Sequence, residues 1–204
     1  MKHLHFPLAA MLSVVIFLAG SISCQNDDEE PAVKKTLSLT LGEHAEGGIV
    51  FYISPNKDTA FIAATEDYGP IVWSTKRVVI PTESTFGAGT LGSGAKNTAI
   101  IVAAKKDDSN DFAARLADDL VLEGFDDWYL PDIEQLTLLY EQRELVGNFA
   151  EATYWSSSAY DGGYPGGGYA ANYNFSPGIY NRRVPDSGQH NPYLIRPVRT
   201  ALPK

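Results

Sequence analysis

The fold is decided by the stretch GFDDWYLPDIEQLTLLYEQ, residues 124–142, which joins a turn, a tryptophan and the start of a helix. Pro131 and Asp132 mark that start, because proline suits a first helical turn and an Asp side chain caps free N–H groups. Gln135 stands three residues after Asp132 and completes a capping-box pattern. Apolar residues then recur at helical spacing: Ile133, Leu136, Leu139 and Tyr140. We expect a helix here, with Trp128 buried beside its start.

Upstream of this stretch, the sequence predicts a hairpin and two further helices. Residues 48–53 (GIVFYI) and 59–64 (TAFIAA) are rich in the residues that strands prefer, and turn-forming residues 54–58 separate them. The elements that follow are expected in this order: a loop over 82–96, a short helix over 96–104, and a helix over 110–123 that ends at Gly124.

Downstream, the pattern changes to segments rich in Tyr and Gly. We expect a strand at 154–158, a loop at 161–168, a hairpin of 169–175 with 178–184, and a closing strand at 193–199. Alternation places Tyr169, Ala171, Tyr173 and Phe175 on one face of their strand, and Ala170, Asn172 and Asn174 on the other. Trp155 is expected in the core. The elements together predict an α+β fold of mixed, mostly antiparallel strands, two main helices and a long Gly/Tyr-rich loop.

The first residues read as an export signal that ends in a cysteine. Lys2 precedes an apolar run from Phe6 to Gly20, which is shorter than the roughly 20 residues of a membrane-spanning helix. Small residues then lead to Cys24, the only cysteine of the chain. This resembles the lipobox of bacterial lipoproteins, with Ser21 where leucine is usual. It implies a signal peptide over 1–23 and lipid attachment at Cys24; a plain secretory signal with an accidental cysteine is the alternative.

The residues after Cys24 predict an acidic, flexible tether over 24–38, followed by one domain over 39–204. Acidic residues directly after a lipidated cysteine resemble a surface-export signal of some Gram-negative groups. We therefore expect a protein anchored by lipid in the outer membrane, at the cell surface, with the periplasmic face as the alternative.

Composition excludes several classes of function. The net charge of −9 argues against general nucleic-acid binding, which depends on Lys and Arg at phosphates, and one cysteine excludes an intramolecular disulfide. Outside the signal peptide, His44 and His190 are the only histidines and follow no zinc-ligand spacing. The chain has neither a calcium-loop series nor a Gly-x-Ser-x-Gly elbow. We expect no metal, no cofactor and no catalytic residue.

Four segments in order resemble the Lcl C-terminal-type domain of bacterial surface and secreted proteins: 48–53, 124–131, 154–158 and 195–199. The resemblance covers about residues 45–200, with Tyr129 where that family usually has Arg. It implies a C-type-lectin-like fold, in which the N- and C-terminal strands pair and the long loop and following strands often form the ligand face. Some members bind sulfated polysaccharides.

The segment 160–193 is the candidate ligand face, because Tyr, Asn and Gly are typical of adaptable binding surfaces. Its candidate ligand residues are Tyr160, Tyr164, Asn172, Asn174, Tyr180, Arg182, Arg183 and His190. The alternative is that half of these aromatics belong to the core of the sheet. Arg182, Arg183, Arg196 and Arg199 are a possible anion-binding patch; for Arg196 we favour pairing with acids of the helices instead.

These features predict a cell-envelope lipoprotein that acts as a non-catalytic surface binding module for a glycan or a protein partner. One alternative is a structural envelope lipoprotein without a small ligand. Another is an enzyme related to formylglycine-generating sulfatase-modifying proteins, whose chemistry uses active-site cysteines. Because Cys24 is the only cysteine and stands at the lipidation position, the enzyme is disfavoured. The oligomeric state stays open.

Overall fold

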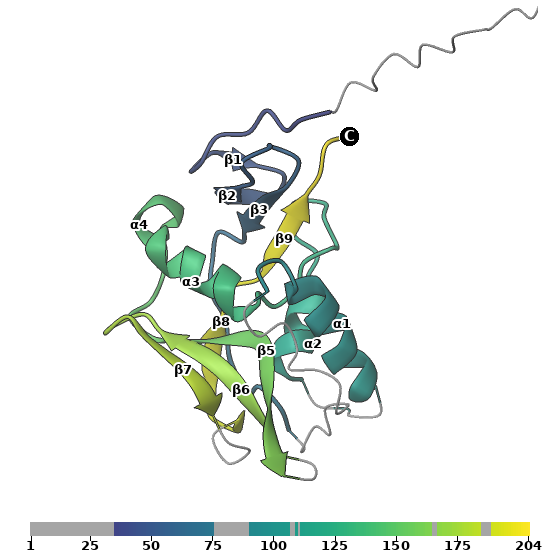
Figure 1. Cartoon of the computed structure of the whole chain (residues 1–204), viewed down its shortest axis with the longest axis vertical. Coiled ribbons are helices and arrows are strands. Elements are labelled where there is room, and N and C mark those ends of the chain that lie inside the picture. The colour runs from purple at the N-terminus through teal and green to yellow at the C-terminus, as the bar shows by residue number, and fades with distance from the viewer. Residues whose placement is uncertain (1–34, 76–89, 107–108, 110, 165–166, 185–188) are drawn as a thin grey trace, which may run out of the picture. The chain divides into compact units, whose positions relative to one another are not determined.

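The computed structural model describes residues 35–75, 90–106, 109, 111–164, 167–184 and 189–204, and for 160–164, 167–168 and 182–184 the backbone only (Figure 1). The expected signal peptide and Cys24 lie outside these residues. The described strands form two sheets, which confirms a mixed α+β fold with mostly antiparallel pairing. The helices are α1 (Gly94–Ala104), α2 (Ala113–Asp118), α3 (Ile133–Glu141) and α4 (Arg143–Val146).

The first sheet joins the start of the described chain to its end. In spatial order it contains β1 (His44–Ala45), β2 (Gly48–Ile53), β3 (Ala60–Ala63) and β9 (Val198–Ala201). The predicted hairpin of β2 and β3 is confirmed, and β9 runs antiparallel to β3. The pairing of a C-terminal strand with the N-terminal hairpin, which the resemblance implied, is therefore present.

The second sheet carries the Tyr-rich segments. Its order is β4 (Tyr68–Ile71), β8 (Tyr193–Ile195), β5 (Thr153–Tyr164), β6 (Gly167–Asn174) and β7 (Ile179–Val184). Figure 1 shows β5, β6 and β7 as neighbouring antiparallel strands. The pairing of β5 with β8 is parallel, and it brings Tyr154 opposite Leu194.

Two expectations about strands are wrong. The segment 161–168 is not all loop, because β5 continues to Tyr164 and β6 begins at Gly167; cross-strand pairing outweighs the weak strand preference of glycine. The segment 193–199 is not one strand. It divides at Arg196 and Pro197, so that β8 and β9 belong to different sheets. Proline has no N–H for a ladder, which favours a break there.

Where the sequence contains a capping motif, the observed helix begins at the predicted position. The Asp132–Gln135 capping box at the start of α3 is present as predicted. The loop expected over 82–96 gives way to α1 from Gly94, and 82–89 lie outside the described residues. The helix expected over 110–123 is shorter, since α2 ends at Asp118. Beyond it, Leu122 and Phe125 exchange both of their backbone hydrogen bonds, at 3.0 Å each, so these groups do not continue the helix.

The second sheet is covered on both faces. Tyr154, Ala171, Tyr173 and Phe175 pack into one hydrophobic cluster with α3, whereas Trp155, Ala159 and Ala170 pack into another with α1 and α2. The alternation predicted for this strand is thus confirmed for Ala170, Ala171, Tyr173 and Phe175, and the aromatic side chains Tyr173 and Phe175 are core. Trp128 and Trp155 are also buried, as expected.

Candidate functional site

A surface pocket of about 420 Å³ lies where α3 and α4 end, and we call it the α3–α4 pocket. Aromatic, charged and amide side chains line it together with the backbone of the loop at 147–151. The lining residues are Tyr140, Arg143, Glu144, Gly147, Asn148, Phe149, Ala150, Glu151, Phe175 and Ser176. A smaller hollow of about 270 Å³ lies along α3 and is lined by Leu91, Glu134, Thr137, Leu138 and Glu141.

The wall of the pocket begins with a turn that ends α4. Val146 is buried in the hydrophobic cluster below α3 and so anchors the end of the helix. Gly147 and Asn148 then have positive φ, +75° and +58°, which Gly adopts freely and Asn tolerates better than most residues. This turn directs the loop at 147–151 along one side of the pocket.

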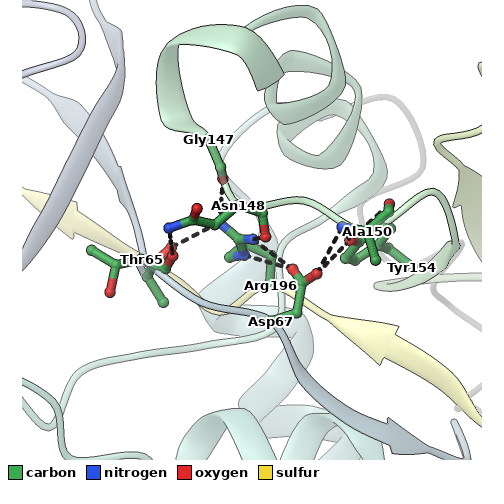
Figure 2. Close-up of polar contacts among 8 residues, drawn as sticks. Thr65, Asp67, Gly147, Asn148, Ala150, Tyr154 and Arg196 are labelled. Atoms are coloured by element: carbon green, nitrogen blue, oxygen red, sulfur yellow. Dashed lines mark hydrogen bonds and ion pairs between the residues drawn. The ribbon is translucent and has the colours of Figure 1, made fainter.

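Arg196 holds this loop from beneath (Figure 2). Its side chain is fully buried, and its guanidinium donates to the carbonyls of Gly147 (3.2 Å) and Asn148 (2.6 Å). A further N–H donates to the Ala64 carbonyl at 3.1 Å. Its Nε donates to Oδ1 of Asp67 at 2.8 Å, and the ion pair closes at 2.6 Å from Nη2. One planar cation thus fastens two successive peptide groups of the loop.

Asp67 extends the same network to the next part of the loop, as Figure 2 shows. Its Oδ2 accepts from the hydroxyl of Tyr154 at 2.6 Å and from the backbone N–H of Ala150 at 3.1 Å. Burial, together with the hydrogen bond to Asp67, raises the pKa of Tyr154, so its hydroxyl stays protonated as a donor. The Asn148 side chain also donates to the Thr65 carbonyl at 3.2 Å. The loop backbone is therefore held at Gly147, Asn148 and Ala150.

Aromatic rings form the floor beside this loop. The Tyr140 ring lies 4.8 Å from the Tyr173 ring, and the Arg143 guanidinium covers Tyr140 at 4.3 Å. Phe175 packs against Tyr140 with its ring edge-on at 5.2 Å. Gly178 is required next to them, because a Cβ atom there would collide with the Tyr140 hydroxyl. These contacts hold the end of α3 against the β6–β7 turn.

The start of α3 is fixed by a buried acid. Asp132 is fully buried, and its carboxylate accepts from the backbone N–H groups of Gln135 (2.8 Å), Gly92 (2.8 Å) and Gly94 (3.2 Å). Burial raises the pKa of Asp132 to about 6, although the N–H donors act to lower it. Ser158 adds a cap, since its hydroxyl accepts from the Ile133 N–H at 3.0 Å. Ser156, which donates to the Ala171 carbonyl, and Ser157, which accepts from Asn97, also have partners within the fold.

The candidate ligand residues of 160–193 occupy different environments. Asn172 is 2% exposed and accepts a hydrogen bond from Asn181 at 2.9 Å, so it lies inside the sheet. Asn174 is half-buried and accepts from the Ser176 N–H at 3.1 Å. Tyr180 is half-buried beside Tyr173, and His190 is exposed. The remaining four have side chains outside the described residues: Tyr160, Tyr164, Arg182 and Arg183.

Arg196 and Arg199 are both paired with carboxylates, so neither contributes to an anion-binding patch; pairing was the favoured expectation for Arg196, whereas the patch is corrected for Arg199. Arg199 forms a bidentate pair with Asp127, at 2.6 and 2.9 Å, and a further ion pair with Glu46 at 3.6 Å. The expected partners were acids of the helices. The observed partners, Asp67, Asp127 and Glu46, all lie in connecting segments between elements.

The sequence argument did not find the α3–α4 pocket. Tyr140 was expected only as a core residue, and Asn148 and Glu151 carried no motif. The Gly147-Asn148 pair after a helix is a recognisable turn signal, but the contact of this turn with Arg196 joins residues 48 and 49 positions apart. That contact has no local signature.

In the described part of the chain, no group of three or more His, Cys, Asp or Glu residues could hold a metal ion. None of the helices described is long and apolar enough to cross a membrane. No family model matches the sequence, and no curated protein matches it significantly.

Proposed function

We propose that this chain is a lipid-anchored envelope protein whose domain is a non-catalytic binding module, with the α3–α4 pocket as its site and a glycan as its ligand. The observation that carries this proposal is the fully buried Arg196, which fixes the pocket loop from beneath. A loop held in one conformation loses little entropy when it binds, and this increases affinity.

A buried ion pair such as Arg196–Asp67 contributes little net stability to a fold. Removing a guanidinium and a carboxylate from water costs several kcal/mol, and well-packed apolar residues often replace such a pair without loss of stability. The pair instead fixes the position of the loop, because a planar guanidinium can reach Gly147, Asn148 and Asp67 at the same time. Positioning of the loop accounts for this arrangement better than stability does.

The chemistry of the pocket suits a sugar. Its volume of about 420 Å³ lies within the range of about 300–1,000 Å³ that is usual for small-ligand sites. Phe149 is half-buried and offers part of its apolar ring surface, whereas Asn148, Glu151 and Ser176 offer hydrogen-bonding groups. A sugar ring presents both apolar C–H faces and hydroxyl groups, so it complements this mixture.

We further propose that the domain has the C-type-lectin-like fold of the Lcl C-terminal-type family. The antiparallel pairing of β9 with β3 supports this. Tyr129, which stands in place of that family's usual Arg, is buried and donates or accepts at Thr200 (2.7 Å) while accepting from Gln135 (2.9 Å). The tyrosine that stands in place of arginine therefore has its own hydrogen-bond partners.

A glycan-array screen of residues 31–204, repeated with Asn148→Ala and with His190→Ala, tests the proposed site. His190 is exposed and does not line the α3–α4 pocket, so it serves as the control. We expect glycan binding that Asn148→Ala weakens and His190→Ala does not. A repeat with EDTA should leave binding unchanged. Loss of glycan binding in His190→Ala alone would place the site in the segment 160–193. The absence of any glycan binding would contradict the proposal.

A further inference from the structure

We infer that the ligand of the α3–α4 pocket carries a positively charged amino group that pairs with Glu151, which makes it an amino sugar rather than a sulfated or carboxylated one. This inference rests on the proposed function, because it assigns the ligand class of the same pocket. It is carried by a comparison of the three charged side chains that line the pocket: Arg143, Glu144 and Glu151.

Arg143, the single cation of the lining, is already engaged. Its guanidinium lies 4.3 Å above the centre of the Tyr140 ring, and its Nη1 donates to the Tyr140 carbonyl at 2.8 Å. Its Nε lies 3.8 Å from Oε1 of Glu144. The ring quadrupole, the carbonyl and the carboxylate all compensate its positive charge. Arg143 is therefore poorly placed to bind an anion.

Glu151 is the uncompensated charge of the lining. In the described part of the chain, no ion pair reaches its carboxylate, and the residue is exposed. Its backbone is nevertheless fixed on both sides. The Ala150 N–H donates to Asp67 (3.1 Å), the Ala152 N–H to the Ala150 carbonyl (2.8 Å), and the Phe175 N–H to the Ala152 carbonyl (2.8 Å).

A carboxylate carried on a held backbone, at the edge of a preorganised pocket, favours a cationic hydrogen-bond donor. Hydrogen bonds between charged partners are about twice as strong as neutral ones. The other arginines near the fold's centre do not reverse this preference, since Arg196 and Arg199 are paired with Asp67 and Asp127. The net charge of −9 also repels polyanions. An amine-bearing sugar satisfies each of these conditions.

Calorimetric titration of residues 31–204 with three probes tests the inference: a β-1,4-linked glucosamine tetramer, its fully N-acetylated counterpart, and a heparin tetrasaccharide. The first two share one skeleton and differ in charge, and pH 6 keeps the amines protonated. We expect the glucosamine tetramer to bind about tenfold or more tightly than the N-acetylated tetramer, and heparin to bind weakest.

Glu151→Gln should remove this tenfold preference, whereas Glu141→Gln is the matched control and should retain it. Glu141 carries the same charge and is exposed on α3, but it does not line the α3–α4 pocket. Equal affinity for the two tetramers, or a preference that survives Glu151→Gln, overturns the inference. If Asn148→Ala still weakens binding in that case, the pocket remains the site; binding to none of the probes, or binding indifferent to Asn148→Ala, overturns the proposed site as well.

Discussion

Arg196 shows how much one residue can determine about a site that it does not line. It is buried beneath the loop at 147–151, where its N–H groups reach carbonyls of that loop and of Ala64. The Phe149 ring packs against the guanidinium in a cation–π contact, with 3.9 Å from the guanidinium carbon to the ring centre. A lysine would keep the charge but present a single ammonium in place of the planar fork.

We predict that Arg196→Lys lowers the free energy of unfolding by roughly 2–4 kcal/mol, because one ammonium group cannot replace the part-buried hydrogen bonds to Gly147 and Asn148 together with the pair to Asp67. Urea denaturation measures the change in stability, and hydrogen exchange of the Ala150 amide measures the order of the loop. Arg143→Lys, at a half-exposed position, should change stability by less than about 0.5 kcal/mol. Equal effects of the two substitutions would show that the buried network does not hold the loop.

The raised pKa of Asp132 leads us to predict that the stability of the protein depends on pH. Its pKa is about 6 in the folded protein against an ordinary value of 3.8, so the folded state binds more protons between these values. Stability from this group is therefore full below about pH 4 and is lost as the pH rises through 6, by up to about 3 kcal/mol. Urea midpoints between pH 3.5 and 7.5 measure it.

Asp132→Asn is the control for this pH dependence. Asparagine keeps an oxygen that can cap α3 but has no proton to lose in this range. The difference in unfolding free energy between the native chain and the variant should vary with pH between about 4 and 6 and level off outside that window. A difference that stays constant across the window would contradict the assignment to Asp132.

At the scale of elements, β5 separates the two main hydrophobic clusters. Tyr154 faces one cluster and Trp155 the other, so the strand has apolar residues on both faces. The serines that follow look like surface residues in the sequence. They are buried because their polar atoms serve neighbouring elements, as when Ser158 caps α3 and Ser156 donates to the Ala171 carbonyl at 2.9 Å.

Trp155→Ala should destabilise the protein by roughly 3–5 kcal/mol, since it leaves a large cavity between β5 and the helices α1 and α2. Thermal unfolding followed by circular dichroism measures this loss. Val121→Ala is a suitable reference, because Val121 is 70% exposed and should change stability by less than about 0.5 kcal/mol. A small effect of Trp155→Ala would mean that the cluster around it collapses to fill the space.

Gly48 is needed for the close contact between β2 and β3. A Cβ atom at this position would collide with the Ala63 carbonyl oxygen, which is backbone and cannot move aside. Gly48→Ala should therefore cost about 1–3 kcal/mol through overpacking, even though alanine is otherwise the better strand residue. Denaturant unfolding measures this loss, and an unchanged midpoint would show that the hairpin can shift to accommodate the methyl group.

At the scale of the whole molecule, the proposed lipid anchor and the proposed binding function of the domain can be tested separately. Cys24→Ala should prevent incorporation of labelled fatty acid and move the protein from the membrane fraction to the soluble fraction, because a lipid chain contributes about 0.8 kcal/mol for each buried CH₂ group. Folding of residues 35–204 should not change, as judged by the thermal midpoint. Retention in the membrane fraction by Cys24→Ala would contradict the lipid anchor.

What the sequence determined by itself was mainly local. Side-chain periodicity and capping residues predicted the β2–β3 hairpin, the start of α3 and the burial of Trp128 and Trp155, because these depend on neighbours along the chain. Alternation also placed Tyr173 and Phe175 together in the core. The same local reasoning overextended α2 and treated 193–199 as one strand, since it could not show which sheet each half would join.

Only the tertiary structure decided the site. The pocket loop is held by Arg196, Asp67 and Tyr154, which are far apart in sequence and meet because β8, β5 and the segment before β4 lie side by side in the fold. The ion-pair partners of Arg196 and Arg199 could not be assigned from the sequence. Whether an arginine is free or paired depends on which carboxylate the fold brings next to it. That is settled by long-range contacts, whereas the pattern of residues specifies only the local elements.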